Sequence, residues 1–411
     1  MGINAGDTAW IIVAAALVLF MTPGLAFFYG GMVRSKNVLG MLAQNYVTMG
    51  VVSVLWILFV YSIAFSGKGR FIGDLHQFGL AHISEPPTGL ALTIPPIVFV
   101  SFQLMFAIIT PALITGGVAD RMKFISWILF AALWLVLVYA PIAHWVFSPS
   151  GWIAKRGVED FAGGIVVEAN SGISTLALVL VLGRRRGWPQ ERMRPHNLPL
   201  VLVGAGILWF GWFGFNAGSA LAANTLSAFA FINTNTAAAT GLLGWLLVER
   251  YRDGKPTTLG AASGAIAGMV AITPACGFVS PVGSIFIGLI AGMLCAFAVN
   301  LKHKYKFDDA LDVVAVHFVG GVIGMILLGF LGTQVINGKN GLFYGGGFHL
   351  LWVQVSSLII ASLYAFTVTL AIAYFLKKTI GLRVTDEQEY QGMDLTFHGE
   401  TAYESPGGMG R

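Results

Sequence analysis

Charged residues are scarce in this sequence. Asp, Glu, Lys and Arg make up only 10% of the 411 residues, whereas 56% are hydrophobic. About a quarter of an ordinary soluble domain is charged, so the composition excludes that class and predicts a polytopic membrane protein whose surroundings are a lipid bilayer. In such a protein the formal net charge of +5 reflects which loops hold Lys and Arg, and it does not indicate a nucleic-acid partner.

Cysteine is also rare. Cys276 and Cys295, both in apolar runs, exclude a disulfide framework and a cysteine metal motif. The histidines show no metal-ligand spacing, and no nucleophile or cofactor motif is present at the centre. We therefore predict no metal site, no cofactor and no enzymatic activity. The segment MGINAGDTAW lacks the basic region and cleavage site of a signal peptide, so we expect the N-terminus to be retained.

Long apolar runs are abundant. Judged against about 20 residues for a spanning helix, eleven runs qualify, and the chain is predicted to be all-α with eleven transmembrane helices. The abundant glycine, 52 residues, suits closely packed membrane helices. The predicted spans are residues 9–32, 41–66, 95–118, 124–147, 161–183, 198–218, 226–248, 258–275, 280–300, 310–332 and 349–376.

Basic residues are distributed unevenly between alternate loops. With the N-terminus outside, only five of the 24 Lys and Arg residues fall in outer segments, namely Lys68, Arg70, Lys155, Arg156 and Lys339. By the positive-inside rule this bias places the N-terminus outside, and the odd number of spans then places the C-terminus in the cytoplasm. We expect a multi-pass protein of the plasma or inner membrane.

Two segments, DFAGGIVVEANSG (160–172) and DALDVVAVHFVGG (309–321), have the same layout. Each has an Asp, an ionisable residue eight positions later and a Gly four positions after that: Asp160, Glu168 and Gly172, and then Asp309, His317 and Gly321. The match predicts two inverted halves of five spans, with a final helix added. Eight residues at about 1.5 Å each bring the two ionisable residues about 12 Å inward from opposite faces, near the centre of the bilayer.

The four ionisable residues differ in expected role. Asp160 and Asp309 stand at helix starts, where a carboxylate accepts hydrogen bonds from free backbone N–H groups, so we interpret both as structural acids. Glu168 and His317 do not stand at helix starts, so neither caps a helix. An ionisable group within a span marks the path of a substrate, ion or proton. We therefore expect this pair to be functional.

Six motifs lie along the chain, namely GLAFFYGGMVRSKN (24–37), FQLMFAIITPALI (102–114), DFAGGIVVE (160–168), GWFGFNAGSA (211–220), DDALDVVAVH (308–317) and GLRVTDEQEYQGMDLTFHGETAYE (381–404). Together these motifs resemble ammonium transporters of the Amt/Mep/Rh superfamily, on the Amt side. The resemblance covers nearly the whole chain and implies an eleven-helix, pseudo-twofold protomer that forms a homotrimer, with one hydrophobic pore in each protomer. It implies a transmembrane domain over 1–380 and a cytoplasmic regulatory tail over 381–411 that works with PII-type proteins.

The resemblance also implies roles for single positions. Phe106, Phe147 and Ser219 would bind the cation, Phe106 and Phe215 would form a gate, and Glu168 and His317 would line the pore as a proton relay. Two positions depart from the family pattern: Phe147 replaces the usual Trp, and Glu168 replaces the first of two facing histidines.

The implied function is uptake of extracellular ammonium. NH₄⁺ would be recruited, lose its proton, and cross as NH₃ past Glu168 and His317, with or without the proton. Methylammonium is a further expected substrate. An ammonium sensor that signals through its tail is the alternative, and transport is favoured because no signalling domain follows the tail in this sequence.

Overall fold

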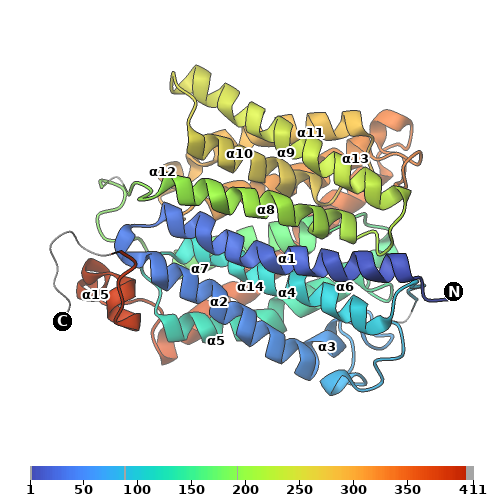
Figure 1. Cartoon of the computed structure of the whole chain (residues 1–411), viewed down its shortest axis with the longest axis horizontal. Helices are drawn as coiled ribbons and strands as arrows, with labels where there is room; N and C mark the ends of the chain where they lie inside the picture. Colours follow the sequence, from blue (N-terminus) through green and yellow to red (C-terminus); the bar gives the residue numbers. More distant parts are fainter. Residues whose placement is uncertain (1, 88, 192, 404–411) are drawn as a thin grey trace.

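The chain is a bundle of long helices (Figure 1). This computed structural model describes residues 2–87, 89–191 and 193–403, and within those ranges it contains helices and two isolated β-bridges but no strand. Arg192, Arg411 and Glu404, which contributed to the predicted charge bias and tail motif, lie outside the described residues. The prediction of an all-helical membrane protein is confirmed.

Helices occupy all eleven predicted spans. In the first half these are α1 (Ala5–Met32), α2 (Val38–Leu55) continued by η2 (Trp56–Val60) and α3 (Tyr61–Phe65), α4 (Pro96–Val118), α5 (Phe124–Trp134) continued by η4 (Leu135–Tyr139) and α6 (Ala140–Phe147), and η6 (Gly164–Ala169) continued by α7 (Asn170–Leu182). In the second half they are α8 (Leu198–Gly218), α9 (Thr225–Arg252), α10 (Thr258–Ile272), α11 (Pro281–Ala298), and η7 (Val314–Phe318) continued by α13 (Val319–Leu331). The added final helix is α14 (His349–Thr379).

The remaining elements are short. Single 3₁₀ turns are η1 (Ser35–Asn37), η3 (Phe78–Leu80), η5 (Ala154–Arg156) and η8 (Leu342–Tyr344), and α12 (Leu301–Tyr305) follows α11. The C-terminal segment folds into α15 (Asp386–Gln391) and η9 (Asp394–His398). A capping box at Thr385 and Gln388 starts α15.

By length and hydropathy, 9 helices of the described chain can cross a membrane on their own. The two other predicted spans are α9 and α10. Helix α10 is apolar but has only 15 residues, and α9 is long enough, but its Thr and Asn side chains lower its hydropathy. One of these, Asn233, is fully buried and donates to the carbonyl oxygens of Cys276 and Val279. The number eleven therefore stays a prediction.

Helices α1 and α8, the first span of each predicted half, pack closely along their length (Figure 1). A Cβ added at Gly204 would lie 2.3 Å from the Phe28 nitrogen, and one at Gly214 would lie 2.7 Å from the Ala14 carbonyl oxygen. Higher residue numbers on α8 thus face lower numbers on α1, so the helices are antiparallel. Small residues at this contact let two backbones approach as membrane helices commonly do.

The two ends of the bundle differ. The N-terminus lies at one end, and α15 lies at the other (Figure 1). The backbone N–H of Lys123 donates to the Leu382 carbonyl, so the span that begins at α5 starts beside the C-terminal segment. We call this end the tail face. The same span ends at Phe147, on the opposite end, which we call the vestibule face.

Candidate functional site

Glu168 and His317 lie on two crossing π-helical turns, η6 and η7. The crossing depends on the two glycines that follow them. A Cβ added at Gly172 would lie 2.3 Å from the Phe318 nitrogen, and one at Gly321 would lie 3.0 Å from the Ala169 nitrogen. Each glycine thus packs against the residue that follows the ionisable residue of the other segment. This reciprocal contact positions the Glu168 and His317 side chains opposite each other.

The two side chains form a buried hydrogen bond. The Nδ1 atom of His317 lies 2.7 Å from Oε2 of Glu168, and the residues are 4% and 1% exposed. The contact suits a pair that holds a proton jointly: either an ionised Glu168 accepts from Nδ1–H, or a protonated Glu168 donates to a bare Nδ1.

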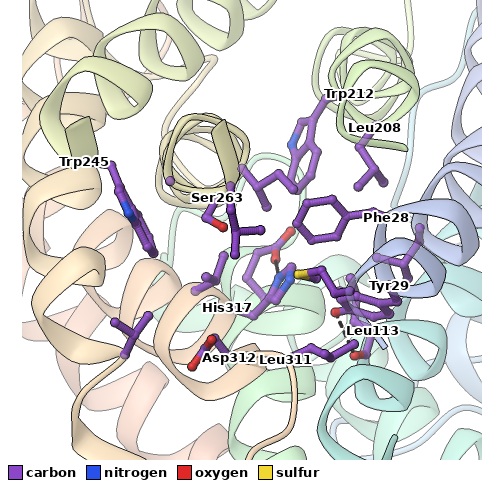
Figure 2. Close-up of a pocket in the computed structure, with 18 of the residues that line it drawn as sticks. Phe28, Tyr29, Leu113, Leu208, Trp212, Trp245, Ser263, Leu311, Asp312 and His317 are labelled. Atoms are coloured by element: carbon purple, nitrogen blue, oxygen red, sulfur yellow. Dashed lines mark hydrogen bonds and ion pairs between the residues drawn. The ribbon is translucent and has the colours of Figure 1, made fainter. Parts of the chain in front are cut away.

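The pair lines a cavity of about 190 Å³. Figure 2 shows Phe28, Leu208 and Trp212 around His317, so much of the wall is apolar. The cavity reaches from Phe215 to a set of polar residues at the tail face, namely Glu249, Arg252, Ser263 and Asp312. A small neutral molecule can occupy it without an ionic partner, whereas a cation there would lose most of its hydration.

A second cavity, of about 150 Å³, lies at the vestibule face. Phe106, Phe147 and Ser219 all line it, so the fold brings the three residues predicted for the cation site to one place. The Ser219 hydroxyl donates to the Phe215 carbonyl at 2.8 Å, which leaves its oxygen lone pairs able to accept from a ligand. The other lining residues are Leu90, Phe99, Phe102, Gln103, Phe161 and Leu221.

Phe106 and Phe215 lie between the two cavities. Their ring centroids are 4.4 Å apart with planes tilted by 41°, and each residue is 1% exposed. Phe106 lines the cavity at the vestibule face, and Phe215 lines the cavity that holds His317. The aromatic pair therefore separates the two cavities.

Comparison with known proteins identifies the family. A family model described as the Ammonium Transporter Family matches residues 9–403. The chain belongs to the ammonium transporter family. An ammonium transporter of Mycobacterium tuberculosis is 52% identical, over 98% of this chain and 91% of its own length. One from Bacillus subtilis is 47% identical, over 97% of this chain and 98% of its own length.

The fold agrees with a solved structure. The crystal structure of Candida albicans Mep2 matches with a TM-score of 0.88 and 34% sequence identity, and the match covers 94% of this chain and 87% of that chain. The predicted superfamily is confirmed, and membership in a family of membrane transporters also confirms that this protein is not an enzyme.

In this transporter the two aspartates lie at the starts of the crossing turns. Asp160 accepts from the backbone N–H groups of Gly163 at 2.9 Å and Ile165 at 2.8 Å, and also from Gly164. Asp309 accepts from the Val314 N–H at 2.7 Å. Each carboxylate thus binds free N–H groups at the start of the turn that carries Glu168 or His317.

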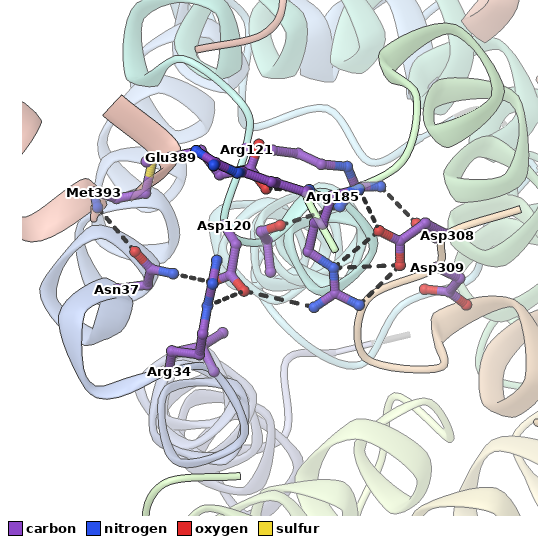
Figure 3. A network of polar contacts seen from close by, with 12 residues as sticks. Arg34, Asn37, Asp120, Arg121, Arg185, Asp308, Asp309, Glu389 and Met393 are labelled. Atoms are coloured by element: carbon purple, nitrogen blue, oxygen red, sulfur yellow. Dashed lines mark hydrogen bonds and ion pairs between the residues drawn. The ribbon is translucent and has the colours of Figure 1, made fainter. Parts of the chain in front are cut away.

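One polar network at the tail face was not predicted from the sequence (Figure 3). Arg185 pairs with Asp308 at 2.8 Å and with Asp120 at 3.5 Å, and Asp120 also lies 3.4 Å from Arg34. Burial raises the pKa of Asp308, but its hydrogen bond to Arg185 and the charges of Arg121 and Arg185 outweigh burial and hold the pKa below the usual value. The sequence shows that these charged residues all flank apolar runs. It does not show which acidic residue pairs with which arginine.

A second cluster was also missed. His76, His82 and Glu85 come together in the loop between α3 and α4. Their spacing matches no metal-ligand motif, and the single 3₁₀ turn η3 in this loop is too short for a shared face to be inferred from the sequence.

Proposed function

We propose that this transporter recruits NH₄⁺ in the vestibule-face cavity, removes its proton near Phe106 and Phe215, and conducts NH₃ past Glu168 and His317. The observation that carries the proposal is the buried Glu168–His317 contact of 2.7 Å inside the apolar cavity below the aromatic pair. The coarser conclusion, ammonium transport, rests on family membership.

Recruitment is assigned to Phe106, Phe147 and Ser219. Aromatic faces attract a cation by about 0.5–2 kcal/mol, depending on how far it is desolvated. The Ser219 oxygen adds an acceptor for one ammonium N–H group. Hydrated Na⁺ and K⁺ lack N–H donors and would lose their water at the apolar constriction, so the same cavity selects against them.

Deprotonation follows from the apolar surroundings below the gate. Low dielectric disfavours the charged form of an amine, so NH₃ enters the lower cavity more readily than NH₄⁺. The released proton needs titratable groups, and Glu168 and His317 supply them within the cavity. Because a carboxylate and an imidazole can exchange a proton across one short contact, we propose that the proton follows the same route and that transport is electrogenic.

The finer arrangement is also part of the proposal. We place the vestibule face outside the cell and the tail face in the cytoplasm, since most Lys and Arg residues fall in the segments that this orientation puts inside. We further propose eleven spans in a plasma or inner membrane, a homotrimer, a transmembrane domain over 1–380, and a tail over 381–411 that responds to a PII-type protein.

The test is solid-supported membrane electrophysiology of the purified protein in liposomes. A jump in ammonium concentration should give a transient current, methylammonium a smaller one and potassium none. Glu168→Gln keeps the size of the side chain but removes the titrating acid, so its ammonium current should fall at least tenfold. Glu191→Gln is the matched control, because Glu191 is exposed and remote from both cavities.

Two outcomes would contradict the proposal. Normal current with unchanged pH dependence in Glu168→Gln would mean that the proton does not use this pair. No ammonium current in the wild type would leave the sensor as the better interpretation.

A further inference from the structure

The loop between α3 and α4 gathers three potential metal ligands at the vestibule face. The donor atoms of His76, His82 and Glu85 all lie within 4.8 Å of one another, and they form the one such group of three among the residues the structure describes. The two imidazole rings are stacked, with centroids 4.4 Å apart and planes 9° from parallel. Nε2 of His76 lies 3.5 Å from Oε2 of Glu85. We propose that this cluster binds a Zn²⁺ ion.

The donor set fits zinc. Neutral imidazole nitrogens and carboxylate oxygens bind Zn²⁺ at about 2.0–2.2 Å, and two donors of a tetrahedral ion then lie about 3.4 Å apart. The His76–Glu85 separation of 3.5 Å already meets that requirement. No separation between donor atoms exceeds 4.8 Å, so none must shrink by more than about 1.4 Å, which rotations of exposed side chains allow. A two-His, one-Glu site leaves a fourth position for water.

Hydrogen bonds from Gln77 fix the backbone at two of the ligand residues. The amide of Gln77, a residue only 4% exposed, donates to the carbonyl oxygens of His82 at 3.4 Å and Glu85 at 3.3 Å. The backbone N–H of Gln77 in turn donates to Ser62 in α3 at 3.0 Å. One buried side chain therefore ties two of the three ligand residues to the end of a helix.

The third ligand residue is fixed separately. Asp74 accepts from the His76 backbone N–H at 3.0 Å and from the Ser66 hydroxyl at 2.6 Å. All three ligands are thus held near one another without a metal, which reduces the entropy lost when an ion binds. A solvent-facing hollow of about 400 Å³, lined by His76, Glu85 and Asp74, gives a hydrated ion access.

Isothermal titration calorimetry of the full-length protein, purified without a histidine tag, tests the proposal with ZnCl₂ as the probe. The wild type should bind one Zn²⁺ per protomer. His76→Ala and His82→Asn should each weaken binding at least tenfold. Asn suits position 82 because His82 has a φ of 55°, a backbone conformation that Asn tolerates. His303→Ala is the matched control, since His303 is exposed and stacks on Trp188 away from the loop.

A second measurement does not depend on the variants folding. X-ray absorption of the Zn²⁺-loaded wild type should show a shell of nitrogen and oxygen at about 2.0–2.2 Å with two imidazoles. The assignment would be overturned if wild type, His76→Ala and His82→Asn bound Zn²⁺ with equal affinity. It would also be overturned if the absorption spectrum showed a single imidazole, or sulfur, around the ion. A wild type that binds no Zn²⁺ would overturn it as well.

Discussion

Glu168 stands in a place where an unpaired carboxylate would be costly. A buried charge is tolerated when a partner compensates for lost hydration, and removing one partner of a buried pair costs about 3–5 kcal/mol. The His317 contact at 2.7 Å supplies that partner. Both side chains are buried, so each compensates for the hydration that the other has lost.

Phe147 offers a second test at the residue scale. Indole attracts a cation more strongly than a phenyl ring, and a gain of about 1 kcal/mol corresponds to several-fold tighter binding. Phe147→Trp should therefore lower the ammonium concentration that gives half-maximal current by several-fold. Ser219→Ala should raise it by a modest factor, because one acceptor is lost.

The control for that pair of variants is Phe343→Trp. Phe343 is 70% exposed and contacts neither cavity. The ammonium concentration for half-maximal current could change equally in Phe343→Trp and Phe147→Trp, or in neither variant. Either result would mean that recruitment occurs elsewhere.

The sequence revealed different residues by different routes. Matched spacing alone singled out Glu168 and His317, because ionisable groups in apolar runs are unusual. Phe106, Phe147, Phe215 and Ser219 came only from the family resemblance, since a phenylalanine in a membrane helix has no distinctive pattern. The Arg185–Asp308 pair could not be read from sequence, because the partners are 123 positions apart.

At the scale of the element, the unpredicted feature is the π-helical turn. Four spans contain one, and two of these turns, η6 and η7, carry Glu168 and His317. Such turns occur frequently at functional sites. A π-turn shifts the following residues around the helix axis without any change in composition. Hydrophobic patterns could therefore place the helices along the chain but could not show which way Glu168 points.

Gly172 tests whether the crossing of η6 and η7 matters. An added Cβ would meet the Phe318 backbone at 2.3 Å, and backbone cannot move aside as a flexible side chain can. Gly172→Ala should cost about 1–3 kcal/mol in overpacking and lower the melting temperature. Because Phe318 follows His317, the current should fall as well.

Gly206→Ala on α8 is the matched control for this variant, since nothing lies within 4 Å of a Cβ added there. Its melting temperature should stay the same or rise slightly, because Ala favours a helix over Gly. If Gly172→Ala has the same melting temperature and ammonium current as Gly206→Ala, the close crossing of η6 and η7 does not position Glu168 and His317.

At the scale of the whole molecule, the tail-face network joins segments from both halves. Arg185 follows α7, Asp120 follows α4, and Asp308 precedes η7. The network continues into the C-terminal segment through Glu389, which is 1% exposed (Figure 3). Its carboxylate accepts from the Arg186 N–H at 2.7 Å and pairs with Arg383 at 2.7 Å. The segment that carries Asp309 and His317 is therefore connected to α15 by a short series of polar contacts.

The C-terminal segment is also held at α2. Asp394 accepts from the Gly40 N–H at 2.8 Å, and Asn37 accepts from the Met393 N–H at 2.9 Å. These contacts are peripheral to the spans, so their loss should not unfold the bundle. We predict that these contacts influence the loops next to the cavity that holds Glu168 and His317.

Truncation after Leu382 tests this coupling. The shortened protein should keep a melting temperature within a few degrees of the wild type, but its ammonium current should fall or lose its response to a PII-type protein. Glu389→Gln should give part of the same effect, because it weakens the pairing with Arg383 while leaving α15 in place. Glu387→Gln, an exposed change on the same helix, is the control and should behave as wild type. The measurements are electrophysiology for the current, a binding assay for the PII-type protein and thermal denaturation for stability. A truncated protein with wild-type current and an unchanged response to the PII-type protein would show that the tail does not regulate transport.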